Sequence, residues 1–377
     1  MTSSISQHLI APARVLRGEG AWAEALPLIA SLCRRPLLLG RSAATSALRR
    51  RLGSDLRAQG LDPLVGELQY DCCEQDLARL QAELDTTARA GGPIDAVLAA
   101  GGGKVLDAGK LLAQRLGLPC LTVPTSAATC AGWTALANLY SPGGAFEGDV
   151  ALDRCPELLV FDHGLVRQAP PRSLASGLAD AMAKWYEAQV SSGGSGDGMI
   201  QQAVQMARVL RDQLLLEGEL ALAEPGGEAW VRVAEASALT AGLIGGLGGP
   251  RCRTVAAHAV HNGLTQLEAT HGRLHGEKVG FGILVQLRLE EQIAGNQLAA
   301  QARRQLLAFF RTLGLPVTLA DLGLGAASLG DLQAVCAFAC LPHSDLHHLP
   351  FPVSPADLLG ALVSADACPT HQREHAT

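Results

Sequence analysis

The stretch that decides the fold is Ile94-Asp95-Ala96-Val97-Leu98-Ala99-Ala100-Gly101-Gly102-Gly103-Lys104. Its first seven residues form a largely apolar run of strand length, and its glycines lead into a helical pattern that begins near Val105. Glycines let a backbone approach a pyrophosphate closely, and a helix N-terminus offers it free N–H groups and a positive dipole. A plain tight turn would also use glycine, and the pattern matches neither GxGxxG nor a Walker loop.

Other short apolar runs alternate with helical patterns on both sides of this stretch. We predict further strands at 36–40, 121–123 and 158–162, and a basic helix at 43–52. Strands that alternate with helices favour parallel pairing in a doubly wound, Rossmann-like sheet. The first half of the chain is therefore predicted to be an α/β nucleotide-binding domain.

The second half carries helical apolar spacing and almost no strand signal. The predicted helices cover 173–190, 198–222, 227–245, 254–268, 277–293, 298–313 and 354–366. We place the domain boundary near residue 165, with an α/β dinucleotide-binding domain at 1–165 and an all-α domain at 166–377. The tail from Pro369 is polar and is predicted to be poorly ordered.

Composition excludes several classes of protein. The net charge of −6 gives no electrostatic reason to bind nucleic acid or an anionic membrane, and no apolar run is long enough to span a bilayer. The ten cysteines are scattered without a CxxC pair, and no export signal is evident. We therefore expect reduced cysteines, a cytoplasmic protein, a small-molecule substrate and a homo-oligomer.

Four of the eleven histidines fall between His258 and His275. His258 and His261 are spaced i, i+3, so on a helix both imidazoles project from one face. His275 follows a glycine-broken turn and could fold back toward that face. Imidazole is the commonest metal ligand, and Zn²⁺ accepts two histidines and a carboxylate while leaving a position open. Histidines at the surface or at helix caps are the alternative.

Four motifs occur in order along nearly the whole chain, and they are GGGKVLDAGK (101–110), VPTSAATCAGWTALANLY (123–140), GLADAMAKWYEA (177–188) and AAHAVHNGLT…LHGEKVGFGILVQ (256–286). With them the chain resembles the glycerol dehydrogenase branch of the iron-containing alcohol dehydrogenase superfamily, which also includes dehydroquinate synthase. The resemblance implies the fold of those enzymes: an N-terminal α/β nucleotide-binding domain, an all-α C-terminal domain, and a catalytic metal in the cleft between them.

The resemblance implies that Asp180, His258 and His275 are the metal ligands. Asp180 lies among small residues in an apolar helical stretch, and metal ligation would relieve the cost of burying its carboxylate. A solvent-facing Asp180, or one paired with Lys184, is the alternative. His261 would orient a ligand or face the substrate. One divalent ion is expected, Zn²⁺ in preference to Fe²⁺.

On the cofactor side, the resemblance implies a set of residues that contact the dinucleotide, although each could equally be ordinary packing. They are Gly103, Lys104, Thr125, Thr134, Leu136 and Tyr140, to which the glycine turn adds Gly101 and Gly102. Asp107 would help to frame the nicotinamide end. The alternative for Asp107 is a surface ion pair with Lys110, spaced i, i+3.

Three departures from the glycerol dehydrogenase pattern favour an anionic substrate and NADPH. Arg41 stands where those enzymes have an aspartate that holds the ribose, and its charge suits a 2′-phosphate. Cys130 replaces their polyol-contacting aspartate, and Trp133 enters the predicted pocket wall. Arg251 and Arg253 lie in a stretch that is acidic in glycerol dehydrogenases and basic in this chain. The guanidinium group of Arg253 is well suited to bind a substrate carboxylate. Arginines that face solvent are the alternative.

These changes resemble a second branch of the family, the NADPH-dependent hydroxycarboxylate dehydrogenases. We therefore expect an oxidoreductase that transfers hydride between NADP(H), in preference to NAD(H), and a small 2-oxo or 2-hydroxy carboxylic acid. The ion would polarise the ketone of the substrate, and Arg253 would orient its carboxylate. His261 would relay a proton through water. Trp133 would close the pocket whose wall includes Cys130.

Three alternatives remain. The first is an NAD-dependent glycerol or small-polyol dehydrogenase. The second is a lyase similar to dehydroquinate synthase, which is disfavoured because the chain has only four lysines to hold a phosphorylated substrate. The third is a binding protein with a retired active site, which is disfavoured because all three expected ligands are present.

Overall fold

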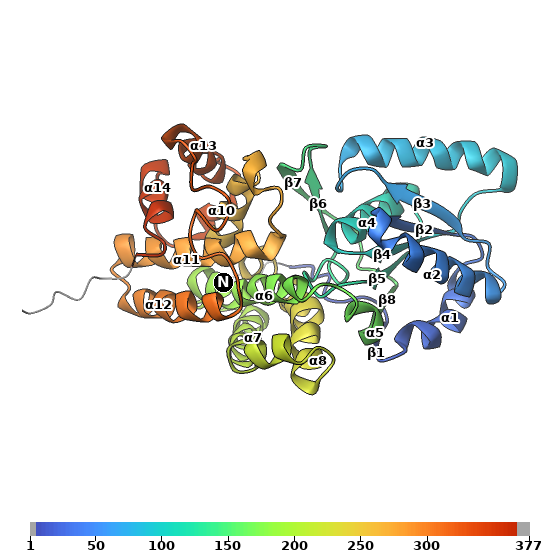
Figure 1. Cartoon of the computed structure of the whole chain (residues 1–377), viewed down its shortest axis with the longest axis horizontal. Helices are drawn as coiled ribbons and strands as arrows, with labels where there is room; N and C mark the ends of the chain where they lie inside the picture. Colours follow the sequence, from blue (N-terminus) through green and yellow to red (C-terminus); the bar gives the residue numbers. More distant parts are fainter. Residues whose placement is uncertain (1–4, 368–377) are drawn as a thin grey trace, which may run out of the picture.

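The first half of the molecule is built on a six-stranded sheet in the order β1-β8-β5-β4-β2-β3 (Figure 1). The computed structural model describes residues 5–367, so the tail predicted from Pro369 lies outside the described residues. The strands are β1 (Val15–Gly18), β2 (Pro36–Arg41), β3 (Leu64–Leu68), β4 (Ala96–Gly101), β5 (Cys120–Pro124) and β8 (Leu158–Asp162). Every neighbouring pair is parallel, which confirms the predicted sheet.

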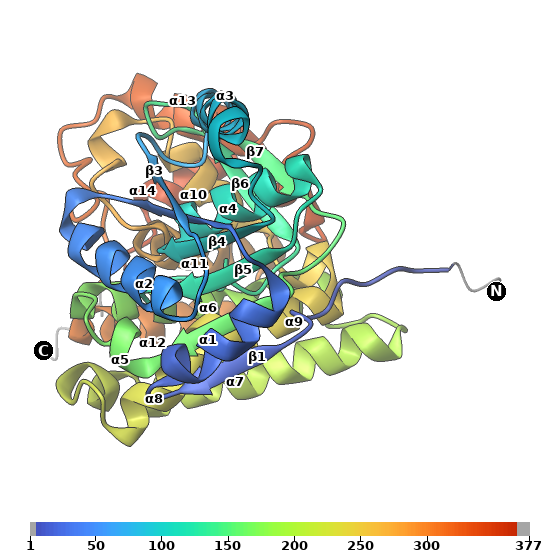
Figure 2. The same cartoon turned by 90° about the vertical axis from the view of Figure 1, so that its right-hand side faces the viewer.

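Helices cover both faces of this sheet, and this explains why its central strands are apolar throughout. Along β2, Leu37 and Leu39 point to one face, and Leu38 points to the other. Helices α3 (Glu74–Gly91) and α4 (Gly103–Leu116) cover the first face, while α1 (Ala21–Leu32) and α2 (Ser46–Ala58) cover the second (Figure 2).

Three parts of this half differ from expectation. Strands β1 and β3 were not predicted. An antiparallel hairpin, β6 (Leu136–Tyr140) with β7 (Phe146–Ala151), occupies a stretch for which no strand was predicted. The hairpin reaches the helical half, because the N–H of Phe146 donates to Oγ1 of Thr265 at 2.9 Å. The predicted basic helix begins with a 3-10 turn, Ala43–Thr45, before α2.

Helices alone make up the second half in the described residues, as predicted. They are α5 (His163–Val166), α6 (Pro171–Ser192), α7 (Gly198–Ala223), α8 (Glu228–Glu235), α9 (Ala241–Gly248), α10 (Ala256–Leu264), α11 (His275–Ala294), α12 (Gln297–Thr312), α13 (Leu329–Ala339) and α14 (Pro355–Val363). A π-helical turn, Ala236–Thr240, divides the helix predicted at 227–245 into α8 and α9. Helix α13 was not predicted.

Helix α6 is the central element of the helical half and reaches the edge of the sheet half (Figure 1). It packs against α7 and α11, and a Cβ placed on its Gly177 would lie 1.8 Å from the carbonyl oxygen of Ala127. Backbone therefore meets backbone where the two halves join. The boundary at residue 165 stays a prediction, and it falls within α5. None of the described helices is both long and apolar enough to cross a membrane.

Candidate functional site

A cavity of about 860 Å³ opens where β2, β4 and β5 reach their carboxyl ends. Open α/β sheets bind ligands at this edge. Residues from both halves line the cavity, so it lies between the sheet and the helices. Every predicted cofactor residue is on its wall: Arg41, Gly101, Gly102, Gly103, Lys104, Asp107, Thr125, Thr134, Leu136 and Tyr140.

Side chains would be crowded at two positions of the glycine turn, Gly101 and Gly103. A Cβ on Gly101 would lie 2.6 Å from Cβ of Val105, and a Cβ on Gly103 would lie 3.1 Å from Cγ2 of Thr129. Gly102 is the extended N-cap of α4 and has no side chain to occupy the first N–H groups of the helix. Those groups open on the cavity, which suits an anion such as a pyrophosphate.

Two cations stand at the cavity wall beside the turn. Arg41, the last residue of β2, and Lys104, in the first turn of α4, both form ion pairs with the carboxylate of Asp71. Nζ of Lys104 also lies 4.9 Å from the ring centroid of Tyr140. Arg41 and Lys104 could be predicted from the sequence, whereas Asp71 follows β3 and belongs to no motif.

Asp107 and Lys110 form the i, i+3 ion pair considered as the alternative, but the pair is buried and does not face solvent. The Nζ of Lys110 lies 3.0 Å from Oδ1 of Asp107 and donates to the carbonyl oxygen of Thr134 at 3.1 Å. Burial raises the pKa of Asp107 in spite of the opposing effect of Lys110. The pair fixes the strand that carries Leu136 against α4.

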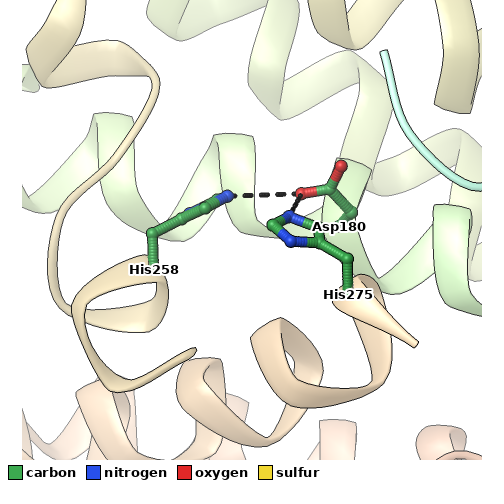
Figure 3. Close-up of side chains that lie close together, drawn as sticks. All are labelled: Asp180, His258 and His275. Atoms are coloured by element: carbon green, nitrogen blue, oxygen red, sulfur yellow. Dashed lines mark ion pairs between the residues drawn. The ribbon is translucent and has the colours of Figure 1, made fainter. Parts of the chain in front are cut away.

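Asp180, His258 and His275 converge at the helical side of the cavity (Figure 3). They come from α6, α10 and the first residue of α11. Oδ1 of Asp180 lies 3.3 Å from Nε2 of His258 and 3.4 Å from Nε2 of His275, yet this buried oxygen has no hydrogen-bond partner among the residues that the structure describes.

This arrangement fits a divalent ion. Ligand atoms about 2.0–2.1 Å from a tetrahedrally coordinated ion lie about 3.3–3.4 Å from one another. Two imidazole nitrogens and one carboxylate oxygen are donors that Zn²⁺ and Fe²⁺ both accept. Burial opposes ionisation of Asp180, but His275, His258 and Lys184 together hold the pKa of its carboxyl well below the usual range. The carboxylate is thus charged and available as a ligand.

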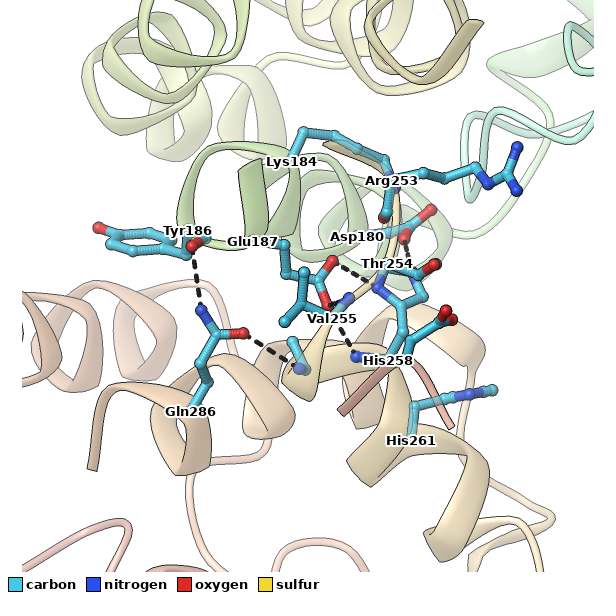
Figure 4. A network of polar contacts seen from close by, with 12 residues as sticks. Asp180, Lys184, Tyr186, Glu187, Arg253, Thr254, Val255, His258, His261 and Gln286 are labelled. Atoms are coloured by element: carbon cyan, nitrogen blue, oxygen red, sulfur yellow. Dashed lines mark hydrogen bonds and ion pairs between the residues drawn. The ribbon is translucent and has the colours of Figure 1, made fainter. Parts of the chain in front are cut away.

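Neighbouring side chains orient both imidazoles, and Figure 4 shows Glu187 beside His258. Nδ1 of His258 lies 2.7 Å from Oε2 of Glu187, which leaves Nε2 facing Asp180. Nδ1 of His275 lies 3.0 Å from Nε2 of His261, and Nδ1 of His261 lies 2.8 Å from Oδ1 of Asn262. If the Nδ1 atoms carry the protons, both Nε2 atoms are free for an ion.

Side chains from other helices also replace the missing cap of α10. Oε1 of Glu187 accepts from the backbone N–H groups of Val255 and His258, at 2.7 and 3.0 Å. Oε1 of Gln286 accepts from the N–H of Ala257 at 3.2 Å, and its Nε2 donates to the carbonyl oxygen of Tyr186 at 3.0 Å. The first N–H groups of this buried helix therefore have partners.

His261 lies behind His275 and is not part of the cavity wall. It occupies the place expected of a group that orients a ligand, and the substrate-facing alternative is not found. Burial, His275 and Lys278 hold its pKa well below the usual range, so its ring is neutral. His271 is remote from the cavity wall, and its Nε2 lies 2.8 Å from the carbonyl oxygen of Thr265.

Cys130 and Arg253 line the cavity, but Trp133 does not. The indole N–H of Trp133 donates to the carbonyl oxygen of Ile10 at 2.9 Å, and its ring packs against Gly242 of α9. The prediction that Trp133 closes the pocket is therefore wrong: the side chain is in the core between the halves. Arg251 is exposed and does not line the cavity either.

The structure adds three groups that sequence analysis did not use for the site. Lys184 and Asp345 line the cavity, and Glu187 orients His258. A signal for two of them was present, because Asp180, Lys184 and Glu187 are spaced i, i+4, i+7 in a helix that is otherwise mostly apolar. Asp345 lies far along the chain in a short turn and had no such signal.

Comparison with known proteins places the chain among metal-dependent alcohol dehydrogenases. A model of the iron-containing alcohol dehydrogenase family matches residues 12–163. An uncharacterized oxidoreductase of Synechocystis sp. is 52% identical over 97% of this chain and 93% of its own length. A glycerol dehydrogenase of Pseudomonas putida is 38% identical, covering 73% of this chain and 75% of its own.

Two further matches bear on the substrate and the fold. Hydroxycarboxylate dehydrogenase A of Escherichia coli K12 is 35% identical, covering 78% of this chain and 80% of its own length. The crystal structure of a probable glycerol dehydrogenase from Sinorhizobium meliloti superimposes with a TM-score of 0.83 at 30% identity, covering 96% of this chain and 98% of that one.

Proposed function

Because this chain belongs to the iron-containing alcohol dehydrogenase family, we propose that it transfers hydride between NADP(H) and a small 2-oxo or 2-hydroxy carboxylic acid. It is a dehydrogenase that acts on CH–OH groups. The observation that carries the narrower proposal is that Arg253 and Cys130 line the cavity that Asp180 also lines. The glycerol dehydrogenase pattern that the sequence resembles has an aspartate at the position of Cys130.

Asp180, His258 and His275 would hold one divalent ion, Zn²⁺ in preference to Fe²⁺. When bound, the ion supplies a Lewis acid for the substrate oxygen. Glu187 and His261 keep the two imidazoles in the required orientation and tautomer. Asp180 and His258 are only 3% and 7% exposed, so the protein shields most of both side chains from bulk solvent.

The dinucleotide would lie along the sheet edge with its pyrophosphate at Gly101–Lys104. Thr125, Thr134, Leu136 and Tyr140 would form the wall beneath it, and Asp107 would stand near the nicotinamide. Arg41 would contact the 2′-phosphate, which supports a preference for NADP(H) over NAD(H). Asp71 pairs with both Arg41 and Lys104, and its single negative charge offsets part of their positive charge.

Arg253 would orient the substrate carboxylate. Its Nε is buried without a hydrogen-bond partner in the described residues, so it has a donor to offer. The thiol of Cys130 adds no negative charge to the wall, because burial raises its pKa. The proton that completes reduction would have to come from solvent or from a group on the cavity wall, since His261 is not on that wall.

A second candidate is an NAD-dependent glycerol or small-polyol dehydrogenase, which the glycerol dehydrogenase relatives favour. Initial rates with a 2-oxo acid and with glycerol, each with both nucleotides, separate the two. We expect the highest kcat/KM with NADPH and the oxo acid; a preference for glycerol and NAD would overturn the proposal. Asp180→Ala should lose both metal and turnover.

We further propose a cytoplasmic enzyme that works as a homo-oligomer. The nine cysteines within residues 5–367 are all free, which suits a reducing compartment. Light scattering of the purified protein measures the oligomeric state, and a monomer at working concentration would contradict this part of the proposal.

A further inference from the structure

A buried lysine lies on the cavity wall and has no ionic partner in the described part of the chain. Lys184 lies one helical turn after Asp180 on α6 and is 2% exposed. Its Nζ donates to the backbone carbonyl oxygen of Arg253 at 3.0 Å (Figure 4). Within residues 5–367 no carboxylate forms an ion pair with it. The carboxylates on the same helix face, Asp180 and Glu187, pair with His258 and His275 instead.

Burial of the Lys184 ammonium group costs free energy unless a bound anion balances its charge. A buried ammonium needs a counter-charge, and a neutral carbonyl oxygen does not supply one. The ammonium group has three N–H donors, and the carbonyl of Arg253 takes only one of them. If Asp180 binds a divalent ion, its negative charge is no longer available to balance Lys184.

A second unsatisfied donor lies beside it. The side chain of Arg253 also lines the cavity, and its Nε is buried without a partner in the described residues. Lys184 thus holds the backbone of the residue whose guanidinium was expected to meet the substrate. Cys130 completes this corner of the cavity and brings no charge to it.

We propose that Lys184 receives the carboxylate of the substrate, together with Arg253, and so determines the preference for an anionic 2-oxo acid over a neutral ketone or polyol. This inference rests on the proposed function and deepens it. In a 2-oxo acid the carboxylate is bonded directly to the carbonyl carbon, so one group must bind the anion close to the Asp180 site. Lys184 is placed one helical turn from Asp180 and meets that requirement.

The test compares Lys184→Met and Lys184→Gln with wild type, using pyruvate and its neutral amide, 2-oxopropanamide. Removal of a charged hydrogen bond should lower kcat/KM for pyruvate by about 10- to 100-fold, mainly through KM, and leave the amide within about twofold. Lys184→Gln keeps a donor for the carbonyl of Arg253, so it distinguishes the effect of losing the charge from the effect of losing this hydrogen bond. Arg251→Met removes an exposed charge from the same segment and should behave as wild type.

Binding of oxamate, an anionic non-reacting analogue, to each metal-loaded protein with NADPH gives a readout that does not depend on turnover. We expect it to weaken in both Lys184 variants and not in Arg251→Met. Equal losses for pyruvate and the amide would mean a purely structural lysine and would overturn the inference alone. Wild type that reduces no oxo acid would overturn the proposed function, and the inference with it.

Discussion

Oε2 of Glu187 lies 2.7 Å from Nδ1 of His258, and this contact decides which nitrogen of the imidazole faces Asp180. Glu187 is fully buried, and its other oxygen accepts from the backbone N–H groups of Val255 and His258. Burial opposes protonation of His258, but Glu187 and Asp180 outweigh it and raise the pKa of the imidazole to about 9. One carboxylate thus fixes both the helix and the ring that it carries.

Replacing Glu187 by Gln should weaken metal binding by about 10- to 100-fold. With its oxygen kept on the two backbone N–H groups, the new amide would point its NH₂ at Nδ1 of His258 and force the proton onto Nε2. That tautomer has no lone pair to offer an ion. Competition with a chromophoric chelator measures the affinity, and unchanged affinity would contradict the role given to Glu187.

Replacing Arg41 by Ala should weaken NADPH binding by about 10- to 100-fold and leave NADH within about threefold, because one charge-assisted contact to the 2′-phosphate is lost. Titration of the intrinsic tryptophan fluorescence gives both dissociation constants. Equal weakening of the two nucleotides would show that Arg41 does not read the 2′-phosphate.

Replacing Asp71 by Asn should have the opposite effect on NADPH. The change removes the carboxylate that pairs with Arg41 and Lys104, so both cations become available to phosphate. We expect tighter NADPH binding and a steeper dependence on salt concentration. Weaker binding would mean that Asp71 chiefly holds the two cations in place.

A methyl group on Gly276 should move His275. A Cβ there would lie 1.8 Å from the carbonyl oxygen of Ser176, and the N–H of Gly276 donates to Oγ of the same serine at 3.0 Å. Gly276→Ala should therefore separate α11 from α6, with a stability loss of about 1–3 kcal/mol and loss of metal. Gly360→Ala in α14 is the control, since nothing lies within 4 Å of its Cβ, and it should unfold no earlier than wild type.

Because of Lys278, the free energy of unfolding should increase as the pH rises above about 8. Burial and the neighbouring Lys104 lower the pKa of its ammonium from 10.5 to about 8. Below about pH 8 both folded and unfolded chains are protonated and the destabilisation is complete. Between pH 8 and 10.5 the unfolded chain binds more protons, so unfolding becomes harder as pH rises.

Lys278→Met should therefore be more stable than wild type at pH 7, by on the order of 2 kcal/mol, with a gap that closes toward pH 10. Urea unfolding of both proteins across this range measures the gap. A constant difference at every pH would show that the lysine charge is not the cause.

The sheet could be predicted wherever a strand is apolar throughout. β2, β4, β5 and β8 are buried along nearly their whole length, and all four were predicted. β1 is short and contains Arg17 at an exposed position, and β3 has exposed residues between buried ones. Such strands are stabilised by pairing with their neighbours in the sheet, and their own sequences give little indication of a strand.

The residues of the candidate site also fall into two groups, those that could be predicted from the sequence and those that could not. Asp180, His258 and His275 belong to motifs that sequence analysis could recognise, and the structure brings them together. The contact of Asp71 with Arg41 depends on how the loop after β3 lies against the end of β2 in the folded protein. Trp133 was misplaced because its ring packs against Gly242, more than a hundred residues further along the chain.

The three proposed metal ligands all belong to the helical half, whereas the glycine turn and Arg41 lie at the ends of sheet strands and of α4. In the proposed function, different segments of the chain would determine the choice of dinucleotide and the activation of the carbonyl group. Redesign at the tips of β2 and β4 can alter which reductant the enzyme accepts while α6, α10 and α11 keep their chemistry, a separation that directed evolution can exploit.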